Sequence, residues 1–322
     1  MSQSARAFRR IAACHVPLFA VLLLFASGCD NSDTLSPATD LPASGDPSED
    51  AVAVEIAPTD APTAEVSFAG GIPFGLSAQP TEQFNGTFNG ALRNIYPQYL
   101  LRELAGIKAR GGRVALNLAG GMSRYTDRDG SFNLDEWKAE VARFRNVNFR
   151  SYIEDGTIIG HYMIDEPHHA SKYGGKAISG STLEEMARYS KSLYPSMPTI
   201  ARTFPDYLAK WGPYRSLDAA WAPYVYRFGD PRKFVEYHAN VAKREGLALI
   251  VGLNVLKGGP NKNKMSASQV RDWGSALLSN SYPCAFISWK YDSRYLTSSV
   301  KDAMNDLRNK AESRSSKSCR GG

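Results

Sequence analysis

The sequence predicts a (β/α)8 TIM barrel, in which parallel strands alternate with helices around a closed sheet. Three observations support this fold class. Apolar strand-like runs alternate with amphipathic helical segments from residue 73 to residue 311, as parallel strands joined by crossover helices require. This stretch contains no linker-like segment, and its length matches one barrel domain. No glycine-rich nucleotide fingerprint follows the first strand, which argues against an open nucleotide-binding sheet.

Seven strands can be assigned from short apolar runs rich in β-branched and aromatic residues. In chain order they are PFGLSAQ (73–79), RVALNLAG (113–120), GTIIGHYMI (156–164), TIARTF (199–204), DAAWAPYVY (218–226), ALIVGLNVL (248–256) and CAFISWKY (284–291). A complete barrel needs one more strand. We expect it to be irregular, either in VSFAGG (66–71) or in the loop after Gly120.

Helices are expected between these strands, at residues 97–112, 133–145, 181–194, 231–246, 266–280 and 298–311. Asn133 is a suitable N-cap and is followed three residues later by Glu136, close to a capping box. Ser181 and Glu184 have the same spacing at the start of the third helix.

Residues 1–28 have the layout of a secretory signal peptide. Three arginines (Arg6, Arg9 and Arg10) precede the apolar run VPLFAVLLLFA, and small residues follow it before Cys29. The segment ASGC resembles the bacterial lipobox, in which the cysteine becomes the lipidated first residue. This resemblance implies a lipoprotein held at a membrane of the bacterial cell envelope through Cys29. The alternative is an ordinary cleaved signal.

Residues 29–68 are expected to be a disordered tether. This segment is rich in Pro, Ser, Ala, Thr and Asp and contains nine acidic and no basic residues, so it cannot bury enough apolar surface to fold. Without it and the signal, residues 69–322 contain 35 basic and 23 acidic residues, a net charge of +12. That excess favours an acidic polymer or an anionic surface as partner; simple solubility is an equal alternative. No nucleic-acid-binding motif is present.

Cys284 and Cys319 remain once the signal and Cys29 are set aside. An even pair of cysteines in an exported protein is typically a disulfide. We therefore expect a bond that fixes the basic C-terminal tail to the last strand.

Polar and aromatic residues gather where the predicted strands end. These residues are Asn117, Asp165, Glu166, Arg202, Tyr224, Tyr226, Asn254, Trp289, Tyr291 and Asp292. Barrel enzymes carry their chemistry at the carboxyl ends of the strands. Amides and carboxylates bind sugar hydroxyls, and flat rings stack on sugar faces, so this rim suits a glycan.

The segment YMIDEP (162–167) resembles the (N/D)-E-P strand end of glycoside hydrolase barrels. In those enzymes the glutamate is the catalytic acid/base, so the resemblance implies this role for Glu166, in surroundings that raise its pKa. Trp289 in FISWKYD resembles the last-strand tryptophan that lines their donor subsite. Asp165 is expected to point away from Glu166, because neighbouring strand residues face opposite sides, and to act as a supporting group.

The sequence departs from the retaining enzymes at one position. They carry a second glutamate at the end of the penultimate strand, where this chain has Asn254. Asp292 and Asp206 are the candidates for the second carboxylate. Trp289, Tyr291, Tyr224, Asn254, Arg202 and Asn117 are expected to bind the sugar, and His161 to bond Glu166 or a sugar hydroxyl.

The sequence therefore predicts an exported, membrane-anchored glycoside hydrolase that acts as a monomer without cofactor or metal. One alternative is a carbohydrate-binding lipoprotein without activity, which Asn254 favours. Another is a metal-dependent hydrolase or deacetylase, which rests only on His161, His168 and His169 near the carboxylates.

Overall fold

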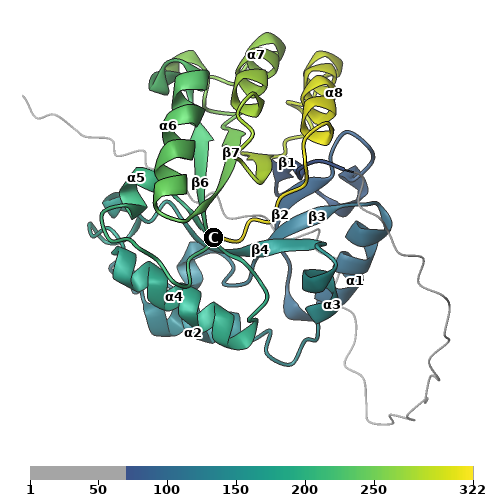
Figure 1. Cartoon of the computed structure of the whole chain (residues 1–322). Helices are drawn as coiled ribbons and strands as arrows, with labels where there is room; N and C mark the ends of the chain where they lie inside the picture. Colours follow the sequence, from purple (N-terminus) through teal and green to yellow (C-terminus); the bar gives the residue numbers. More distant parts are fainter. Residues whose placement is uncertain (1–69, 322) are drawn as a thin grey trace, which may run out of the picture. The chain divides into compact units, whose positions relative to one another are not determined.

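The barrel closes with eight parallel strands in chain order, which confirms the predicted fold (Figure 1). The structure is a computed structural model that describes residues 70–321; the expected signal, Cys29 and the expected tether lie outside the described residues. The strands are β1 (Phe74–Ser77), β2 (Gly90–Asn94), β3 (Arg113–Asn117), β4 (Ile158–Asp165), β5 (Thr199–Arg202), β6 (Ala219–Tyr224), β7 (Ala248–Leu253) and β8 (Ala285–Ser288).

Helices surround the strands and bury the outward-facing strand residues in a continuous apolar core. They are α1 (Pro97–Ala109), α2 (Leu134–Ala142), α3 (Arg150–Glu154), α4 (Gly180–Leu193), α5 (Pro205–Leu208), α6 (Pro231–Arg244), α7 (Ala267–Leu278) and α8 (Ser298–Glu312). Within residues 70–321, no helix is long and apolar enough to span a membrane.

The eighth strand is β2, and both positions expected for it were wrong. It pairs with β1 and β3 over Gly90–Asn94. Its sequence GALRN has no β-branched or aromatic residue, so it lacks the composition by which strands are recognised. The helix expected directly after β1 follows β2 instead, and only the short 3-10 turn η1 (Thr81–Gln83) lies between β1 and β2.

The inside of the barrel is filled by a second apolar cluster. Its larger members include Leu92, Tyr162, Ile200, Trp221 and Ile250, from five different strands. Small residues such as alanine accompany them on β6, β7 and β8. The barrel is therefore a packed core, and a ligand can enter only at one of its ends.

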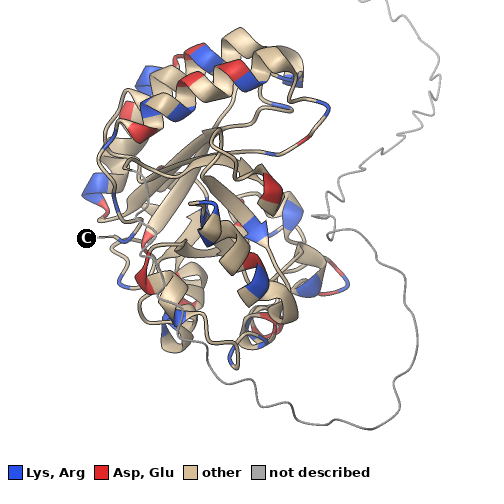
Figure 2. Ribbon diagram, turned by 90° about the vertical axis from the view of Figure 1, so that its right-hand side faces the viewer, with Lys and Arg blue, Asp and Glu red and all other residues tan. Residues whose placement is uncertain are grey.

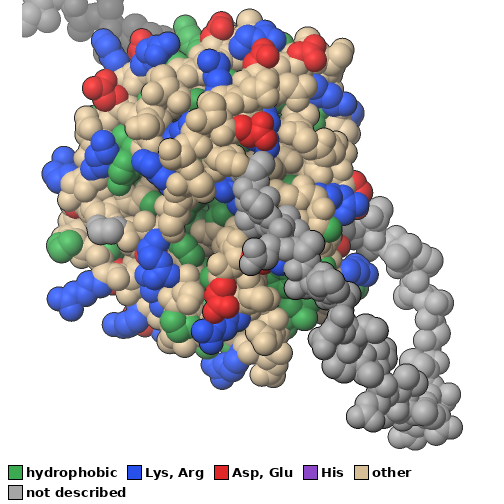
Figure 3. Space-filling view, turned by 45° about the vertical axis from the view of Figure 1, so that its right-hand side comes forward, with side chains coloured by type: hydrophobic (Ala, Val, Ile, Leu, Met, Phe, Trp, Pro, Cys, Tyr) green, Lys and Arg blue, Asp and Glu red, His purple; other side chains and the backbone are tan. Residues whose placement is uncertain are grey.

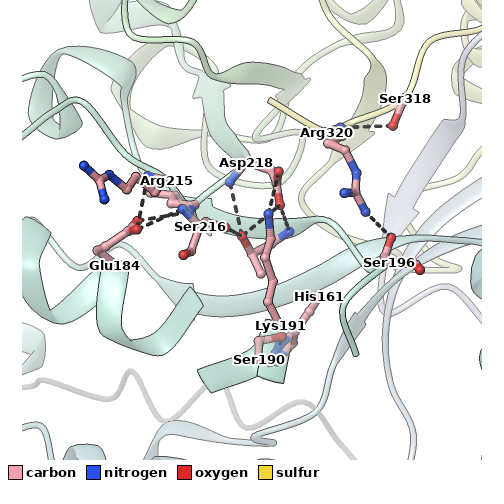
Figure 4. A network of polar contacts seen from close by, with 12 residues as sticks. His161, Glu184, Ser190, Lys191, Ser196, Arg215, Ser216, Asp218, Ser318 and Arg320 are labelled. Carbon is pink, nitrogen blue, oxygen red and sulfur yellow. Dashed lines mark hydrogen bonds and ion pairs between the residues drawn. The ribbon is translucent and has the colours of Figure 1, made fainter. Parts of the chain in front are cut away.

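The cap predicted at Asn133 is confirmed, because its side-chain oxygen accepts hydrogen bonds from the backbone N–H groups of Asp135 and Glu136. The start of α4 differs: Ser179, not Ser181, accepts the N–H of Thr182. The N-cap is set by where the helical backbone begins, two residues earlier than expected. Glu184, expected in that cap, instead accepts backbone N–H groups from the loop before β6 (Figure 4).

The C-terminal tail closes the amino-terminal end of the barrel. The predicted Cys284–Cys319 disulfide is confirmed, and both cysteines belong to the interior cluster. Arg320 donates to the carbonyl oxygen of Ser196 at 2.5 Å (Figure 4). Figure 1 shows the chain end at the centre of the ring of strands. The opposite, carboxyl-terminal end is thus the one left for a site.

Charged residues lie mainly on the helices and loops, whereas the strands are largely uncharged (Figure 2). The face drawn in Figure 3 carries more Lys and Arg than Asp and Glu, and it contains a hollow with apolar side chains at its base. The basic excess counted in the sequence is therefore visible on this face.

Candidate active site

A cavity of about 370 Å³ lies at the carboxyl-terminal mouth of the barrel. Its walls come from the segments that follow β4, β5, β6 and β7. Its volume falls in the range of small-molecule sites. The residues that line it are Glu166, His169, Arg202, Phe204, Pro223, Val225, Tyr226, Arg227, Phe228, Asn254, Lys257, Gly258, Gly259, Asn261 and Lys262. Four of the residues that the sequence places at the rim are among them: Glu166, Arg202, Tyr226 and Asn254.

Glu166 has a left-handed backbone conformation, with φ at 46°, directly after β4. This is costly for a residue with a side chain and is typical of functional sites. Asp165 and Glu166 were expected to point in opposite directions. Both instead reach one cation: Lys172 Nζ lies 2.6 Å from Asp165 Oδ2 and 2.8 Å from Glu166 Oε2. The expectation was wrong because the left-handed residue ends the alternation of the strand.

Asp165 is held in place by three side chains. Arg202 forms an ion pair with Oδ1, the Tyr162 hydroxyl donates to the same oxygen at 2.8 Å, and Lys172 binds Oδ2. Burial alone would raise the pKa of Asp165, but the positive charges of Arg202 and Lys172 outweigh burial and hold that pKa well below its usual range. Asp165 is therefore a fixed negative charge that orients Arg202 and Lys172.

Arg202 connects the two carboxylates with Trp289. Its side chain is only 5% exposed, and Nη1 lies 3.7 Å from Glu166 Oε1. Its guanidinium lies 4.9 Å from the centre of the Trp289 ring, a cation–π contact that orients both groups. Trp289 also forms a backbone bridge with Asn254. Groups from the ends of β4, β5, β7 and β8 thus meet at one rim.

Asn254 follows β7, which the eight-strand order makes the penultimate strand. Its Oδ1 accepts the backbone N–H of Lys257 at 3.0 Å, so the amide also fixes the loop beyond it. Among the residues described around the cavity, Glu166 is the only carboxylate. Among these described residues, the cavity therefore presents one acid, with the Asn254 amide directly after β7.

Tyr224, predicted to contact the sugar, faces the helices. It is 1% exposed, its hydroxyl donates to the carbonyl of Gly229, and its ring packs edge-on against Phe234 at 5.3 Å. The neighbouring Pro223 and Val225 line the cavity instead. The expectation for Tyr224 was wrong because alternation along β6 turns every second residue outward.

His161 also lies outside the barrel and cannot contact Glu166 or a sugar. It is fully buried, its ring stacks on Trp137 at 5.7 Å, and Nδ1 shares a hydrogen bond of 2.8 Å with the Ser190 hydroxyl (Figure 4). Burial lowers the pKa of His161 to about 3. The expected contact was wrong; His161 is a neutral packing residue between β4 and two helices.

Asn117 and Tyr291 hold the rim together and do not line the cavity. Both polar ends of the Asn117 amide bond the backbone of Gly120, at 2.9 and 3.0 Å. The backbone N–H of Tyr291 donates to the carbonyl of Ser77 at 2.9 Å, which ties the segment after β8 to β1. Both polar atoms of the Asn117 amide are therefore engaged in fixing the loop after β3.

Asp292 caps the turn after β8. Its Oδ1 accepts the backbone N–H groups of Arg294 and Tyr295 at 2.9 and 3.3 Å, and Oδ2 lies 3.8 Å from Lys264 Nζ. It is not one of the residues around the cavity. The structure therefore does not bring Asp292 into the same cavity as Glu166.

Several cavity residues were not identified from the sequence as part of the site. They are His169, Phe204, Pro223, Val225, Arg227, Phe228, Lys257 and Lys262, together with Lys172 beside the carboxylates. Most lie in loops, where no periodic sequence pattern indicates which way a side chain points. Pro223 and Val225 could have been found, because strand alternation places them opposite Tyr224.

The histidines near the carboxylates do not form a metal site with them. The His168 Nδ1 and the Thr203 hydroxyl are 2.8 Å apart, and burial, followed by the neighbouring His169, lowers the pKa of His168 to about 4. Within residues 70–321, no group of three or more His, Cys, Asp or Glu side chains is arranged to hold a metal ion.

No protein-family model and no curated protein matches this chain. Its fold resembles that of solved glycoside hydrolases. A cellulase in complex with an inhibitor has a TM-score of 0.51 at 10% identity, over 74% of this chain and 92% of that chain. The catalytic domain of the major endoglucanase from Xanthomonas campestris pv. campestris has a TM-score of 0.50 at 11% identity, over 74% of this chain and 95% of that chain.

A β-glucanase from Saccharophagus degradans has a TM-score of 0.51 at 10% identity, over 76% of this chain and 88% of that chain. At such identities the likeness shows the fold alone. The class defined by the fold is therefore the (β/α)8 barrel, in the form that these glycoside hydrolases share.

Proposed function

We propose that this chain is a glycoside hydrolase and that Glu166 transfers the proton at the glycosidic oxygen. The observation that carries the proposal is the placement of Glu166. A left-handed turn after β4 directs its carboxylate into the mouth cavity, where barrel enzymes act. The DEP resemblance and the glycosidase-like fold support the same role.

The cavity combines this acid with surfaces that suit a sugar ring. Phe204, Tyr226 and Phe228 line it, and aromatic faces stack on the apolar face of a sugar. Tyr226 is 53% exposed, so its ring is accessible. When Glu166 gives up its proton, Lys172 and Arg202 are in place to stabilise the resulting carboxylate.

The second carboxylate of a glycosidase comes from outside the cavity in this proposal. Two acids are needed at about 5–5.5 Å for retention or 6.5–9.5 Å for inversion. Asp206, exposed in α5, and Asp292, in the turn after β8, remain the candidates. A loop movement on substrate binding would have to bring one of them to the mouth.

The test is Glu166→Gln, assayed against a panel of oligosaccharides by mass analysis of products. General acid catalysis contributes about 10²–10⁴-fold, so we expect a loss of that size on natural glycans. The loss should be smaller on aryl glycosides with good leaving groups, which need little protonation. Glu236→Gln, an exposed change on α6, is the matched control. Full activity of Glu166→Gln on a natural glycan would refute the proposal.

A second candidate is a carbohydrate-binding protein without activity. The observation that favours it is the single carboxylate in the cavity, with Asn254 at the end of β7. This candidate predicts that the unmodified chain binds a glycan without releasing products. Glu166→Gln would then change affinity but no catalytic rate.

We also propose that the protein is exported and lipid-anchored in the bacterial cell envelope through Cys29. The lipobox-like ASGC and the acidic tether support this localisation. The barrel would then act on glycans as a monomer near the membrane surface.

A further inference from the structure

The cavity contains more positive charge than the proposed proton transfer needs. Near the mouth, Arg202 and Lys172 are balanced by Asp165 and Glu166, within the ion pairs already described. The remaining Lys and Arg side chains around the cavity belong to the wall formed by the segments after β6 and β7. That wall contributes no acidic residue to the cavity.

Three cations form this basic wall: Arg227, Lys257 and Lys262. Arg227 lies in the 3-10 turn η4 (Tyr226–Phe228), with its guanidinium 5.3 Å from the centre of the Phe228 ring. Lys262 ends the 3-10 turn η5 (Pro260–Lys262). Among the described residues, neither Arg227 nor Lys262 has an ion-pair partner.

The backbone of the basic wall is held in a defined conformation. The backbone N–H of Tyr226 donates to the carbonyl of Gly258 at 2.7 Å, which fixes the two loops against each other. In η5, Asn261 and Lys262 are both left-handed, with φ at 56° and 60°. Two consecutive left-handed residues with side chains are costly, and such strain clusters at ligand sites.

We propose that the glycan is anionic and that the basic wall binds a carboxylate or sulfate on the sugar unit next to the one at Glu166. This inference rests on the proposed function and adds the substrate class. An anion in the cavity forms charge-assisted hydrogen bonds with Arg227 and the two lysines. A neutral sugar would cover Arg227 and Lys262 without supplying an ionic partner for either, so it binds more weakly.

The test uses polymers that differ only in charge. Binding of the whole chain to polygalacturonate is compared with binding to the same polymer after reduction of its carboxyl groups. Dextran sulfate and dextran form a second pair, which distinguishes sulfate from carboxylate. We expect at least one anionic polymer to bind more than 10-fold tighter than its neutral partner, because each charge-assisted bond contributes appreciably.

The variant is Arg227→Gln/Lys257→Gln/Lys262→Gln. Its matched control is Lys233→Gln/Lys301→Gln/Lys310→Gln, which removes the same charge from exposed positions on α6 and α8. We expect the cavity variant to lose about 10- to 100-fold in affinity for the preferred anionic polymer and the control to lose less than 3-fold. Both variants should keep the wild-type melting temperature.

The outcomes separate this inference from the proposed function. Charge-selective binding without any hydrolysis would sustain the basic wall and refute the hydrolase. Hydrolysis of neutral glycans, with equal affinity for both members of each pair, would refute the basic wall alone. Three further outcomes would overturn the inference. The two triple variants could lose affinity equally, the chain could bind single-stranded DNA as tightly as its preferred anionic glycan, or it could bind no anionic polymer.

Discussion

At the scale of single residues, the backbone at Glu166 decides the geometry of the site. A side chain in an extended conformation there would continue the alternation of β4 and separate Glu166 from Asp165. The left-handed turn brings both carboxylates to Lys172 and Arg202. The chain thus keeps a locally unfavourable conformation that positions its candidate acid, as strained functional residues do.

This strain can be measured by comparing two substitutions that both remove the carboxylate. Because only glycine adopts φ near 46° without cost, we expect Glu166→Gly to be more stable than Glu166→Ala by about 1 kcal/mol. At Glu236, inside α6, the order should reverse, with Gly less stable by about 0.5–1 kcal/mol. Urea unfolding of the four variants measures both differences. If the Gly variant were more stable than the Ala variant at both positions, or less stable at both, the backbone at Glu166 would not be strained.

Asp165 gives a prediction on pH. Asp165→Asn leaves Arg202 with the longer ion pair to Glu166 as its one remaining ion pair among the described residues, so we expect a loss of about 3 kcal/mol at neutral pH. The folded-state pKa of Asp165 is lowered. Its charge therefore stabilises the fold above the unfolded pKa, about 3.9, and this contribution is lost as the pH falls through the folded value.

The measurement is urea unfolding of the wild type and Asp165→Asn from pH 7 to pH 2. The stability difference should stay constant down to about pH 4 and then shrink. Asp302→Asn, an exposed change on α8, serves as control and should show little difference at any pH. A difference for Asp165→Asn that persists unchanged at pH 2 would mean that packing, not charge, explains its loss.

At the scale of elements, the tail after α8 and the residue that directly precedes β8 form the floor of the barrel. The Cys284–Cys319 bond closes a loop that contains all of α8, with a sequence separation of 35. A cross-link of this length restricts the unfolded chain and stabilises the fold by about 2–4 kcal/mol. The floor lies at the opposite end of the barrel from the cavity.

We therefore expect Cys284→Ser/Cys319→Ser to lower the free energy of unfolding by about 2–4 kcal/mol and to leave glycan binding unchanged. Urea unfolding with and without reductant tests this. Reductant should destabilise the wild type to the level of the double variant and have no effect on the variant. A double variant as stable as the oxidised wild type would show that the tail is held by its other contacts.

At the scale of the whole molecule, the proposed anchor at Cys29 would hold the barrel at a membrane surface. Cys29→Ser removes the thiol that would carry lipid, so we expect the protein to stay unprocessed or to leave the membrane fraction. Detergent-phase partitioning and intact mass of the expressed full chain measure this. Cys14→Ser, within the proposed signal, is the control and should partition like the wild type. Membrane partitioning of a processed Cys29→Ser protein would refute lipidation.

The sequence by itself determined the features that local patterns specify. Alternating apolar runs indicated the barrel, the cysteine pair indicated the disulfide, and Asn133 indicated a helix start; the structure confirms all three. Seven strands were recognised from their composition. β2 was not, because Gly90–Asn94 is held by its neighbours on both sides and lacks a strand signature of its own.

Only the tertiary structure decided which side chains share the cavity. The left-handed turn at Glu166 directs its carboxylate into the cavity, which the periodicity of β4 does not predict. Tyr224 and His161 are instead buried against the outer helices. Lys172 and Lys262 each end a short 3-10 turn in a loop, where no sequence periodicity indicates the direction of the side chain. Sequence periodicity reports the environment of regular elements, whereas a site built from several loops depends on how distant segments meet.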